Sequence, residues 1–198
     1  MDYKAGADKQ MDKEIRMEAV RKLLTTIPHE DADREGLLGT PDRVARMYEE
    51  IFGGYEAEID PLFKAQFKTD NNQMVIVKDI NYWSHCEHHM VPFFGKIHIG
   101  YIPDGTVLGL SKFGRLVEVF ARRLQIQEQL TFQLADEIDK RLKPKGLAIV
   151  VTGKHLCMAM RGIKKETSIT VTNEMRGVFM EDKATRQEFF NTIHNTLR

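Results

Sequence analysis

The amino-acid sequence predicts an α+β fold in which an antiparallel sheet follows an N-terminal helical segment. Residues 1–60 show helical patterns, and residues 61–198 are expected to form one functional domain. From Met74 onward, β-branched and aromatic runs alternate with turn signals. Two long amphipathic helical patterns separate an early pair of strands from a late pair, and a closing helix follows. This order of elements is typical of an α+β protein with an antiparallel sheet.

Two helices are expected in the N-terminal segment. Residues 14–27 place apolar side chains along one helical stripe, whereas residues 1–13 are polar, mixed in charge and expected to be loosely ordered. A second helix should begin at Thr40-Pro41, with threonine as N-cap and proline in the first turn. Gly53-Gly54 should end it. Residues 55–73 are polar and predict an irregular segment.

Five strands are expected after this segment. Met74–Val77 is rich in β-formers, and in Phe93–Ile102 polar residues alternate with isoleucine. Residues 103–106 read Pro-Asp-Gly-Thr, a turn signature that predicts a hairpin between Phe93–Ile102 and Val107–Leu110. Two later strands are expected at Leu147–Thr152 and Ser168–Thr172.

Two long helices should lie between the strand pairs. The first is expected to be capped by Ser111, and its apolar residues recur with i, i+3, i+4, i+7, i+11 spacing. The second covers Gln127–Leu142 and ends at residues 143–146, Lys-Pro-Lys-Gly. A closing helix is expected over Thr185–Leu197. Its inward positions should be Phe189, Phe190, Ile193 and Leu197.

The composition excludes some function classes. The chain has 29 Lys and Arg against 29 Asp and Glu, so no basic excess indicates bulk binding of nucleic acid or anionic membranes. No apolar run approaches the ~20 residues of a membrane span. The polar N-terminus does not resemble a signal peptide, and a cytoplasmic location is therefore expected. In that compartment, two cysteines indicate metal binding or catalysis rather than a disulfide.

Both cysteines lie inside short runs that also contain histidine. Cys86 and His89 are three residues apart, so one short loop can present both to a single ion. Cys157 would add a third ligand from a distant part of the chain. Three such ligands leave tetrahedral Zn²⁺ one open position for water or substrate, which favours a hydrolytic site over a structural one.

Other histidines near these ligands have open roles at this point. His155 shares a strand face with Cys157 if that stretch is extended, so it could be a fourth ligand or an acid or base. His88 has the same ambiguity. The simpler interpretation is that both cysteines are buried core thiols and the histidines are ordinary loop residues. For His85 and His98 that simpler interpretation is preferred.

Basic residues cluster on both sides of the proposed metal site. Ser111-Lys112 and Arg115 place two cations in the first turn of a helix, where each is unfavourable by roughly 0.3–1 kcal/mol. An anion docked there would remove this cost, because backbone N–H groups, a hydroxyl and two cations form a phosphate site. Arg161 and the lysines after it add charge near Cys157. The pattern predicts a polyphosphate substrate, and a solvated helix end is the alternative.

Glu128 stands in the first turn of the second long helix, within Gln127-Glu128-Gln129. A carboxylate there suits the helix dipole, which is a sufficient structural reason for it. It could also accept two parallel hydrogen bonds from the ring N–H and exocyclic amine of guanine, a donor pair that adenine lacks.

Taken together, these residues resemble the GTP cyclohydrolase I family. The matching runs are collinear between about Thr40 and Phe190. They are Cys86-Glu87-His88-His89, residues 94–103, 109–112 and 122–128, His155-Leu156-Cys157-Met158, and Met160-Arg161-Gly162. The resemblance implies the tunnelling fold, with long helices on one face of the sheet. It also implies a decamer of two pentameric rings whose active sites lie at subunit interfaces.

The resemblance further implies a reaction and a set of residue roles. GTP and water would be converted to formate and 7,8-dihydroneopterin triphosphate, the first step of folate and pterin synthesis, with Zn²⁺ as cofactor. Cys86, His89 and Cys157 would be the zinc ligands, and His88, His155 and Ser111 would assist proton transfer. Gln127 and Glu128 would hold guanine. The triphosphate and ribose would be bound by Ser111, Lys112, Arg115 and Arg161, with Arg43 as a further phosphate contact.

Three other classes of protein are alternatives to this one. A zinc deaminase-type hydrolase favours H-x-E followed by P-C-x-x-C, a combination that this sequence lacks, and it would release ammonia instead of formate. A non-catalytic zinc-binding module would neither bind nor consume GTP. A degenerate relative would share the fold with weak turnover, but the intact ligand and histidine set argues against decay.

Overall fold

The structure is a computed structural model that describes residues 6–194. The chain divides between Gly53 and Gly54 into two compact units, which are described separately. Among the described residues, no helix is long and apolar enough to cross a membrane.

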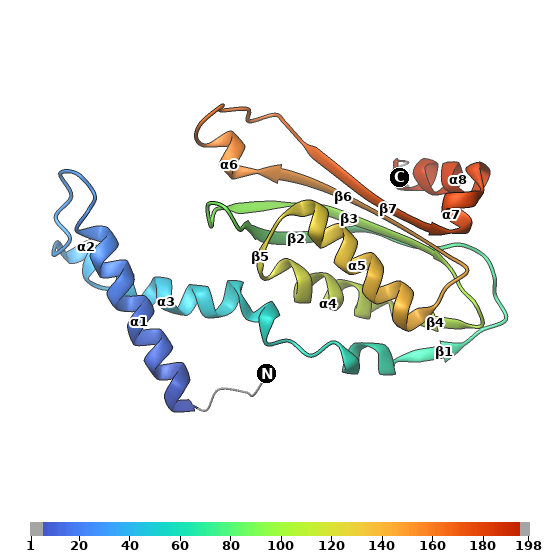
Figure 1. Cartoon of the computed structure of the whole chain (residues 1–198), viewed down its shortest axis with the longest axis horizontal. Coiled ribbons are helices and arrows are strands. Elements are labelled where there is room, and N and C mark those ends of the chain that lie inside the picture. Colours follow the sequence, from blue (N-terminus) through green and yellow to red (C-terminus); the bar gives the residue numbers. More distant parts are fainter. Residues whose placement is uncertain (1–5, 195–198) are drawn as a thin grey trace. The chain divides into compact units, whose positions relative to one another are not determined.

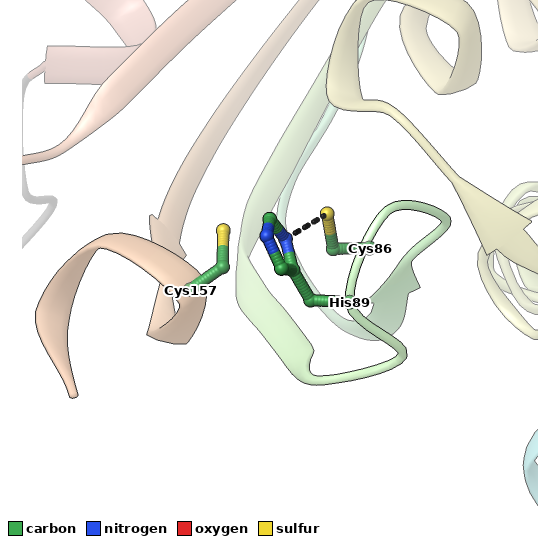
Figure 2. A group of neighbouring side chains, drawn as sticks. All are labelled: Cys86, His89 and Cys157. Atoms are coloured by element: carbon green, nitrogen blue, oxygen red, sulfur yellow. Dashed lines mark hydrogen bonds between the residues drawn. The ribbon is translucent and has the colours of Figure 1, made fainter. Parts of the chain in front are cut away.

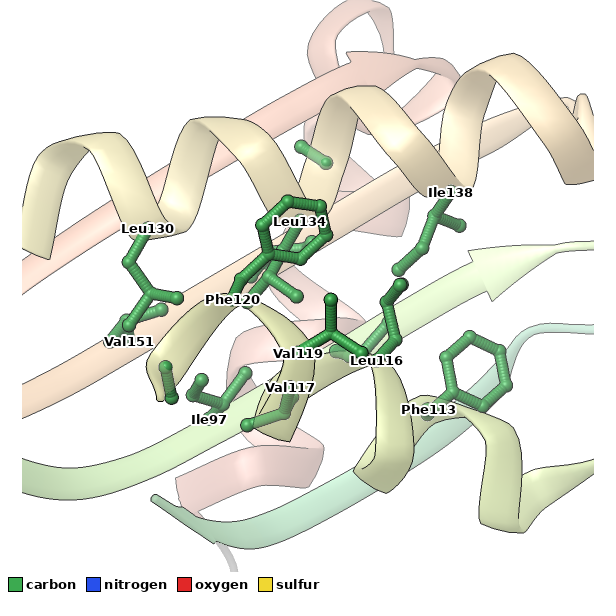
Figure 3. Close-up of a cluster of buried hydrophobic side chains, with 14 of the residues drawn as sticks. Ile97, Phe113, Leu116, Val117, Val119, Phe120, Leu130, Leu134, Ile138 and Val151 are labelled. Atoms are coloured by element: carbon green, nitrogen blue, oxygen red, sulfur yellow. The ribbon is translucent and has the colours of Figure 1, made fainter. Parts of the chain in front are cut away.

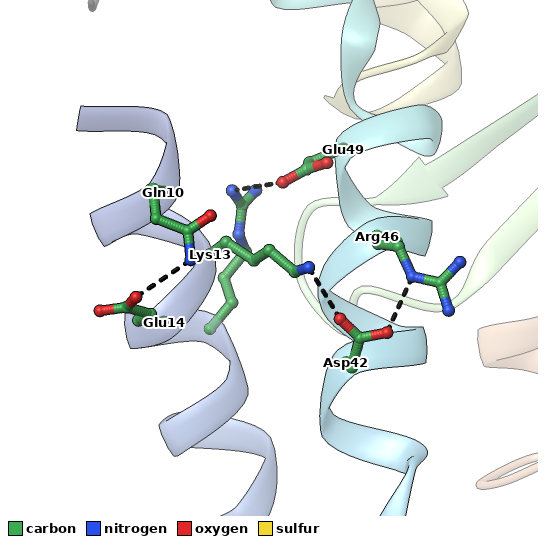
Figure 4. A network of polar contacts seen from close by, with 7 residues as sticks. Gln10, Lys13, Glu14, Asp42, Arg46 and Glu49 are labelled. Carbon is green, nitrogen blue, oxygen red and sulfur yellow. Dashed lines mark hydrogen bonds and ion pairs between the residues drawn. The ribbon is translucent and has the colours of Figure 1, made fainter. Parts of the chain in front are cut away.

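The N-terminal unit is helical, as predicted. It contains α1 (Gly6–Leu24), α2 (Glu35–Leu38) and α3 (Thr40–Ile51). Loose order was expected over residues 1–13, and this is wrong for residues 6–13, which are helical; residues 1–5 lie outside the described part. Ion pairs explain this: Lys13 contacts Asp42 at 2.8 Å, and Arg16 contacts Glu49 at 3.2 Å (Figure 4). The polar side chains of α1 therefore have partners on α3.

The expected start of α3 needs a small correction. Thr40 is the first helical residue rather than the N-cap, which is Gly39, and no side chain caps the helix. Pro41 is buried in the first turn, where its missing N–H costs nothing because the first N–H groups of a helix have no intrahelical partner.

The C-terminal unit is built on a five-stranded sheet of order β5-β2-β3-β6-β7 (Figure 1). All neighbours are antiparallel except β5 and β2, which are parallel. The predicted strands are confirmed, and most are longer than expected. Their bounds are β2 (Val75–Cys86), β3 (Pro92–Ile102), β6 (Gly146–His155) and β7 (Thr170–Gly177). Strand β5 (Leu124–Gln125) was not predicted, because Leu124 was expected to lie on the first long helix.

The predicted hairpin after β3 is wrong. Strand β4 (Thr106–Leu108) pairs with β1 (Gln66–Lys68) in a separate two-stranded sheet. The reason is that both edges of β3 are already occupied, by β2 and by β6. The segment expected to be irregular thus supplies a strand and the 3-10 helix η2 (Asp60–Lys64). Another 3-10 helix, η1 (Gly53–Tyr55), overlaps only its first residue.

Two long helices, α4 (Leu110–Ala121) and α5 (Gln127–Leu142), cover one face of the sheet, as predicted (Figure 1). Their apolar stripes and the inward side chains of the strands form the main core (Figure 3). Ser111 does not cap α4, because the N-cap is Gly109 and no side-chain hydrogen bond is made there. Helix α5 ends where Lys143 adopts a left-handed conformation with φ 49°.

A second, smaller core lies on the opposite face. Successive residues of a strand point to opposite faces, so Ala148 and Val150 join this cluster while their neighbours on β6 join the main core. Helices α7 (Val178–Glu181) and α8 (Lys183–His194) cover it with Phe179 and Phe189. The closing helix is thus confirmed over its described residues. Leu197 lies outside them.

Candidate metal centre

The ends of three adjacent strands bring the predicted metal ligands together. Cys86 is the last residue of β2, and β6 ends at His155, directly before α6 (Leu156–Ala159). The intervening strand β3 begins between them, with Pro92 opposite His85 and Phe93 opposite His155. The register of the sheet therefore places Cys157, on α6, beside the turn that follows Cys86.

The turn after β2 is closed by its own backbone. The Cys86 N–H donates to Val91 O at 2.9 Å, and the Met90 N–H donates to Cys86 O at 2.8 Å. Met90 has φ 55°, which reverses the chain within a few residues. His89 is held in this turn, and the C-x-x-H spacing presents both side chains on the same side of it.

The donor atoms are close enough to share one ion. The ligand atoms of Cys86, His89 and Cys157 all lie within 4.8 Å of one another (Figure 2). Cys86 Sγ lies 3.8 Å from His89 Nδ1. Zn–S bonds of about 2.3 Å and Zn–N bonds of about 2.0–2.1 Å would put tetrahedral ligand atoms roughly 3.5–3.8 Å apart. Two thiols and an imidazole at this spacing fit a zinc ion.

The ionisation of the two thiols depends on whether a cation lies between them. Burial raises the pKa of the Cys157 thiol, and the neighbouring Cys86 raises it further. Two adjacent thiolates repel each other, whereas a divalent cation between them favours their ionised form. The sulfur pair is thus better suited to a bound metal than to a metal-free thiolate pair.

His88 and His155 lie beside the three ligands rather than among them. His88 is exposed, with Nδ1 3.7 Å from Cys86 Sγ and Nε2 3.6 Å from a carboxylate oxygen of Glu87. The His155 ring stacks on Phe93 at 4.6 Å with an interplanar angle of 4°. Its Nε2 lies 2.9 Å from Gln127 Oε1. Burial lowers the pKa of His155, and the Glu128 carboxylate partly offsets this.

The predicted nucleotide-binding residues fall into two separate groups. Gln127 and Glu128 begin α5 beside His155, and Arg161 follows α6, so these belong to the metal end of the sheet. Helix α4 carries Ser111, Lys112 and Arg115 in its first two turns. Arg43 lies on α3 of the N-terminal unit, and its role stays a prediction.

The start of α4 lies at the opposite end of the sheet from the metal ligands. Phe113 in its first turn packs against Tyr101 with ring centroids 5.5 Å apart. Tyr101 pairs with Val75 at the beginning of β2, whereas Pro92 pairs near its end. Tyr101 lies nine residues after Pro92 along the strand, which corresponds to roughly 30 Å. Within one chain, Lys112 and the metal centre therefore do not share a site.

The comparisons with known proteins decide the family. A family model described as GTP cyclohydrolase I matches residues 16–194. The chain belongs to the GTP cyclohydrolase I family.

Curated relatives agree with this membership over most of the chain. "GTP cyclohydrolase 1 2" from Nostoc sp. is 50% identical over 181 residues, which is 90% of this chain and 83% of the relative. "GTP cyclohydrolase 1" from Chlorobium chlorochromatii is 54% identical and covers 83% and 74% of the two chains. "GTP cyclohydrolase 1" from Campylobacter jejuni strain RM1221 is 49% identical and covers 88% and 92%. The family predicted from the sequence motifs is confirmed.

The architecture agrees with the tunnelling fold expected of the GTP cyclohydrolase I family, an antiparallel sheet with two long helices on one face. The packing around His155 was not predicted from the sequence. Gln127 was expected to hold guanine. However, the residue is buried, with 1% of its surface exposed, and its side chain contacts β6, β7 and His155. One signal could have suggested this: Gln127 comes directly before a strongly apolar helix face, and Gly153 offers space opposite it.

Proposed function

We propose that this protein is a zinc-dependent GTP cyclohydrolase that converts GTP and water to formate and 7,8-dihydroneopterin triphosphate. The observation that carries the proposal is the grouping of Cys86, His89 and Cys157 within 4.8 Å, with His155 beside them. Family membership indicates the substrate and the product. Bound zinc would supply Lewis acidity that turns water into a nucleophile near neutral pH.

The protein's own residues bind the purine and move protons around it. His155 and His88 flank the ligand group, and we assign them the proton exchange with the purine ring during its hydrolytic opening. Glu128 is exposed at the start of α5, next to the Gln127 that contacts His155. Its carboxylate would accept hydrogen bonds from the ring N–H and the exocyclic amine of guanine. These bonds would hold the base beside both histidines.

The triphosphate requires a second copy of the chain. Ser111, Lys112 and Arg115 form a cationic helix start at the far end of the sheet, so in one chain they do not reach a nucleotide bound at the metal. A neighbouring subunit would supply them, together with the proton-transfer role assigned to Ser111. Strand β7 is an edge of the five-stranded sheet, and an edge strand can pair with another subunit. We therefore propose active sites at subunit interfaces within a decamer of two pentameric rings.

Two remaining contacts and the location complete the proposal. Arg161, exposed after α6, would bind phosphate or ribose from the metal side of the site, and Arg43 would add a further phosphate contact. Both cysteines are free thiols. A reducing compartment keeps thiols available as zinc ligands, so we propose the cytoplasm.

The reaction is tested by product analysis. Purified protein incubated with GTP should release formate and, after oxidation, give pterin fluorescence. Chelation should abolish both signals, and zinc should restore them. Release of ammonia instead would indicate a deaminase, and zinc-loaded protein that leaves GTP unchanged would reject catalysis.

The shared site is tested by mixing two inactive variants. Cys157→Ser removes a zinc ligand, and Lys112→Ala removes a triphosphate contact at the other end of the same chain. When the two are refolded together, some interfaces receive an intact metal centre from one copy and an intact Lys112 from another. Activity should then return in the mixture. No recovery in proven mixed oligomers would place the whole site within one subunit.

A further inference from the structure

The Gln127 side chain is fixed from three sides. Its Nε2 donates to Val151 O at 3.0 Å on β6 and to Thr170 O at 3.2 Å at the start of β7. It also lies 3.2 Å from Thr172 Oγ1. Because carbonyl oxygens only accept hydrogen bonds, the NH₂ group must face the strands. The amide oxygen therefore points to His155, whose Nε2 is 2.9 Å away.

Two threonines keep this orientation in place. Thr131 Oγ1 donates to Gln127 O at 2.7 Å and lies 2.6 Å from Thr172 Oγ1. Since the single hydroxyl proton of Thr131 goes to Gln127 O, the Thr172 hydroxyl must donate to Thr131. Thr172 Oγ1 is then left to accept from the Gln127 amide, whose two hydrogens serve three acceptors, so one of these hydrogens is shared. Every donor in this buried chain has an acceptor, so a flipped amide would break several bonds at once.

The space for this contact is provided by glycine. A Cβ built on Gly153 would overlap Gln127 Oε1 and come 2.8 Å from Tyr82 Oη. Gly153 lies opposite Gly95 in the β3–β6 register, two residues before His155 on the same face of the sheet. On its other side, the His155 ring is held parallel to Phe93. The plane and the hydrogen-bonding edge of the imidazole are thus both fixed.

We propose that Gln127 is a positioning residue that holds neutral His155 in its Nε2–H tautomer. An amide oxygen only accepts, so the ring nitrogen facing it must carry the hydrogen. Nδ1 is then the nitrogen with the free electron pair, and proton exchange with the substrate passes through it. This inference rests on the proposed function for the role of His155, and it replaces the expected contact between Gln127 and guanine.

Kinetics separate positioning from base binding. Gln127→Ala should lower kcat roughly 10–100-fold, less than the ~10²–10⁴-fold that general acid–base catalysis itself contributes, and leave KM for GTP within about twofold. In combination with His155→Ala, it should add less than about a further twofold loss, because its effect acts through that imidazole. A raised KM with unchanged kcat, or a loss that multiplies with that of His155→Ala, would overturn the proposal.

Gln125 offers a matched control. It is also a buried glutamine, 4% exposed, whose Nε2 donates to Phe120 O at 3.0 Å and to Gln133 Oε1 at 2.8 Å. Gln125→Ala should destabilise the fold by a similar amount and leave kcat per folded protein unchanged. An equal fall in kcat for both variants, with zinc content intact, would reduce Gln127 to a structural role.

Nitrogen NMR of ¹⁵N-histidine-labelled protein reads the tautomer without turnover. Above the ordinary histidine pKa of about 6.5, His155 should show a protonated Nε2 and a bare Nδ1 in wild-type protein, with or without zinc. Its signals are assigned by their loss in His155→Ala. A protonated Nδ1 would refute the inference even if GTP is consumed, and a protonated Nε2 would support it even if the proposed reaction fails. Because the tautomer is read on wild-type protein, the test stands even if Gln127→Ala does not fold.

Discussion

We expect zinc to stabilise this protein, and replacing Cys157 by serine should remove most of that gain. Its sulfur lies within 4.8 Å of the ligand atoms of Cys86 and His89, and about 1 Å of closure would form a tetrahedral set. A serine hydroxyl stays protonated and does not replace a thiolate. Loss of a supporting partner outside the ligand set already costs ~10–100-fold in metal affinity. We therefore expect the loss of a ligand itself to raise the zinc Kd at least about 100-fold.

This change converts into a measurable difference in unfolding free energy. With free zinc at about 100 times the wild-type Kd, binding stabilises the folded wild type by about 2.7 kcal/mol. In the serine variant the same zinc concentration would at most equal Kd, which gives about 0.4 kcal/mol. Urea unfolding with zinc and with chelator measures the gain for each protein separately, so any effect of the mutation on the metal-free fold cancels.

The control for this experiment is His155→Gln. His155 lies outside the ligand group and contacts Gln127, so this variant should keep the full zinc-dependent gain. If it loses the gain, His155 is a ligand. If Cys157→Ser gains as much as wild type, the sulfur does not bind zinc and the assignment of the centre fails.

Three further outcomes are expected. Glu128→Gln should raise KM for GTP at least tenfold in steady-state assays, because an amide cannot accept both guanine donors; an unchanged KM would reject this contact. Gly114→Ala should raise the unfolding free energy by about 0.5–1 kcal/mol in urea titrations, since Gly114 lies inside α4 and an added Cβ meets nothing within 4 Å; destabilisation would contradict the open space. Burial lowers the pKa of His98. The stability that neutral His98 contributes to the folded state is therefore present above pH about 6.5 and is lost as pH falls below that value. His98→Asn, which keeps an acceptor for the Asp79 N–H that now donates to His98 Nδ1, should make the decline in acid shallower; an identical slope would assign the decline to other groups.

The elements that the sequence predicted best are those with a complete local signal. Helix α5 runs over Gln127–Leu142 as expected, because its apolar period and its lysine- and glycine-containing stop lie within the helix and its flanks. The hairpin after β3 failed for the opposite reason. Its turn signal was local, but the pairing of β4 was decided by β6, which occupies the remaining edge of β3 more than forty residues later in the chain.

The candidate site shows the same division. The Cys86-x-x-His89 pair is a local feature of one turn, and together with the second His/Cys run around Cys157 it predicted a metal. The Gln127 contact joins a helix start to β6 and β7, and no spacing within the sequence indicates which way an amide will point. The separation of Lys112 from the metal likewise depends on where β3 begins and ends. Motifs therefore supplied the residues, and the sheet decides which of them a single chain can bring together.

Strand register, more than any single ligand, holds the site together. Cys157 meets Cys86 only because β3 aligns Pro92 with His85 on one side and Phe93 with His155 on the other. A slip of one residue between β3 and β6 would turn His155 to the opposite face and part it from Gln127. Gly95 resists such a slip, because a Cβ there would overlap Thr152 O on the neighbouring strand. The backbones of β3 and β6 can thus approach closely where Gly95 pairs with Gly153, two residues before His155.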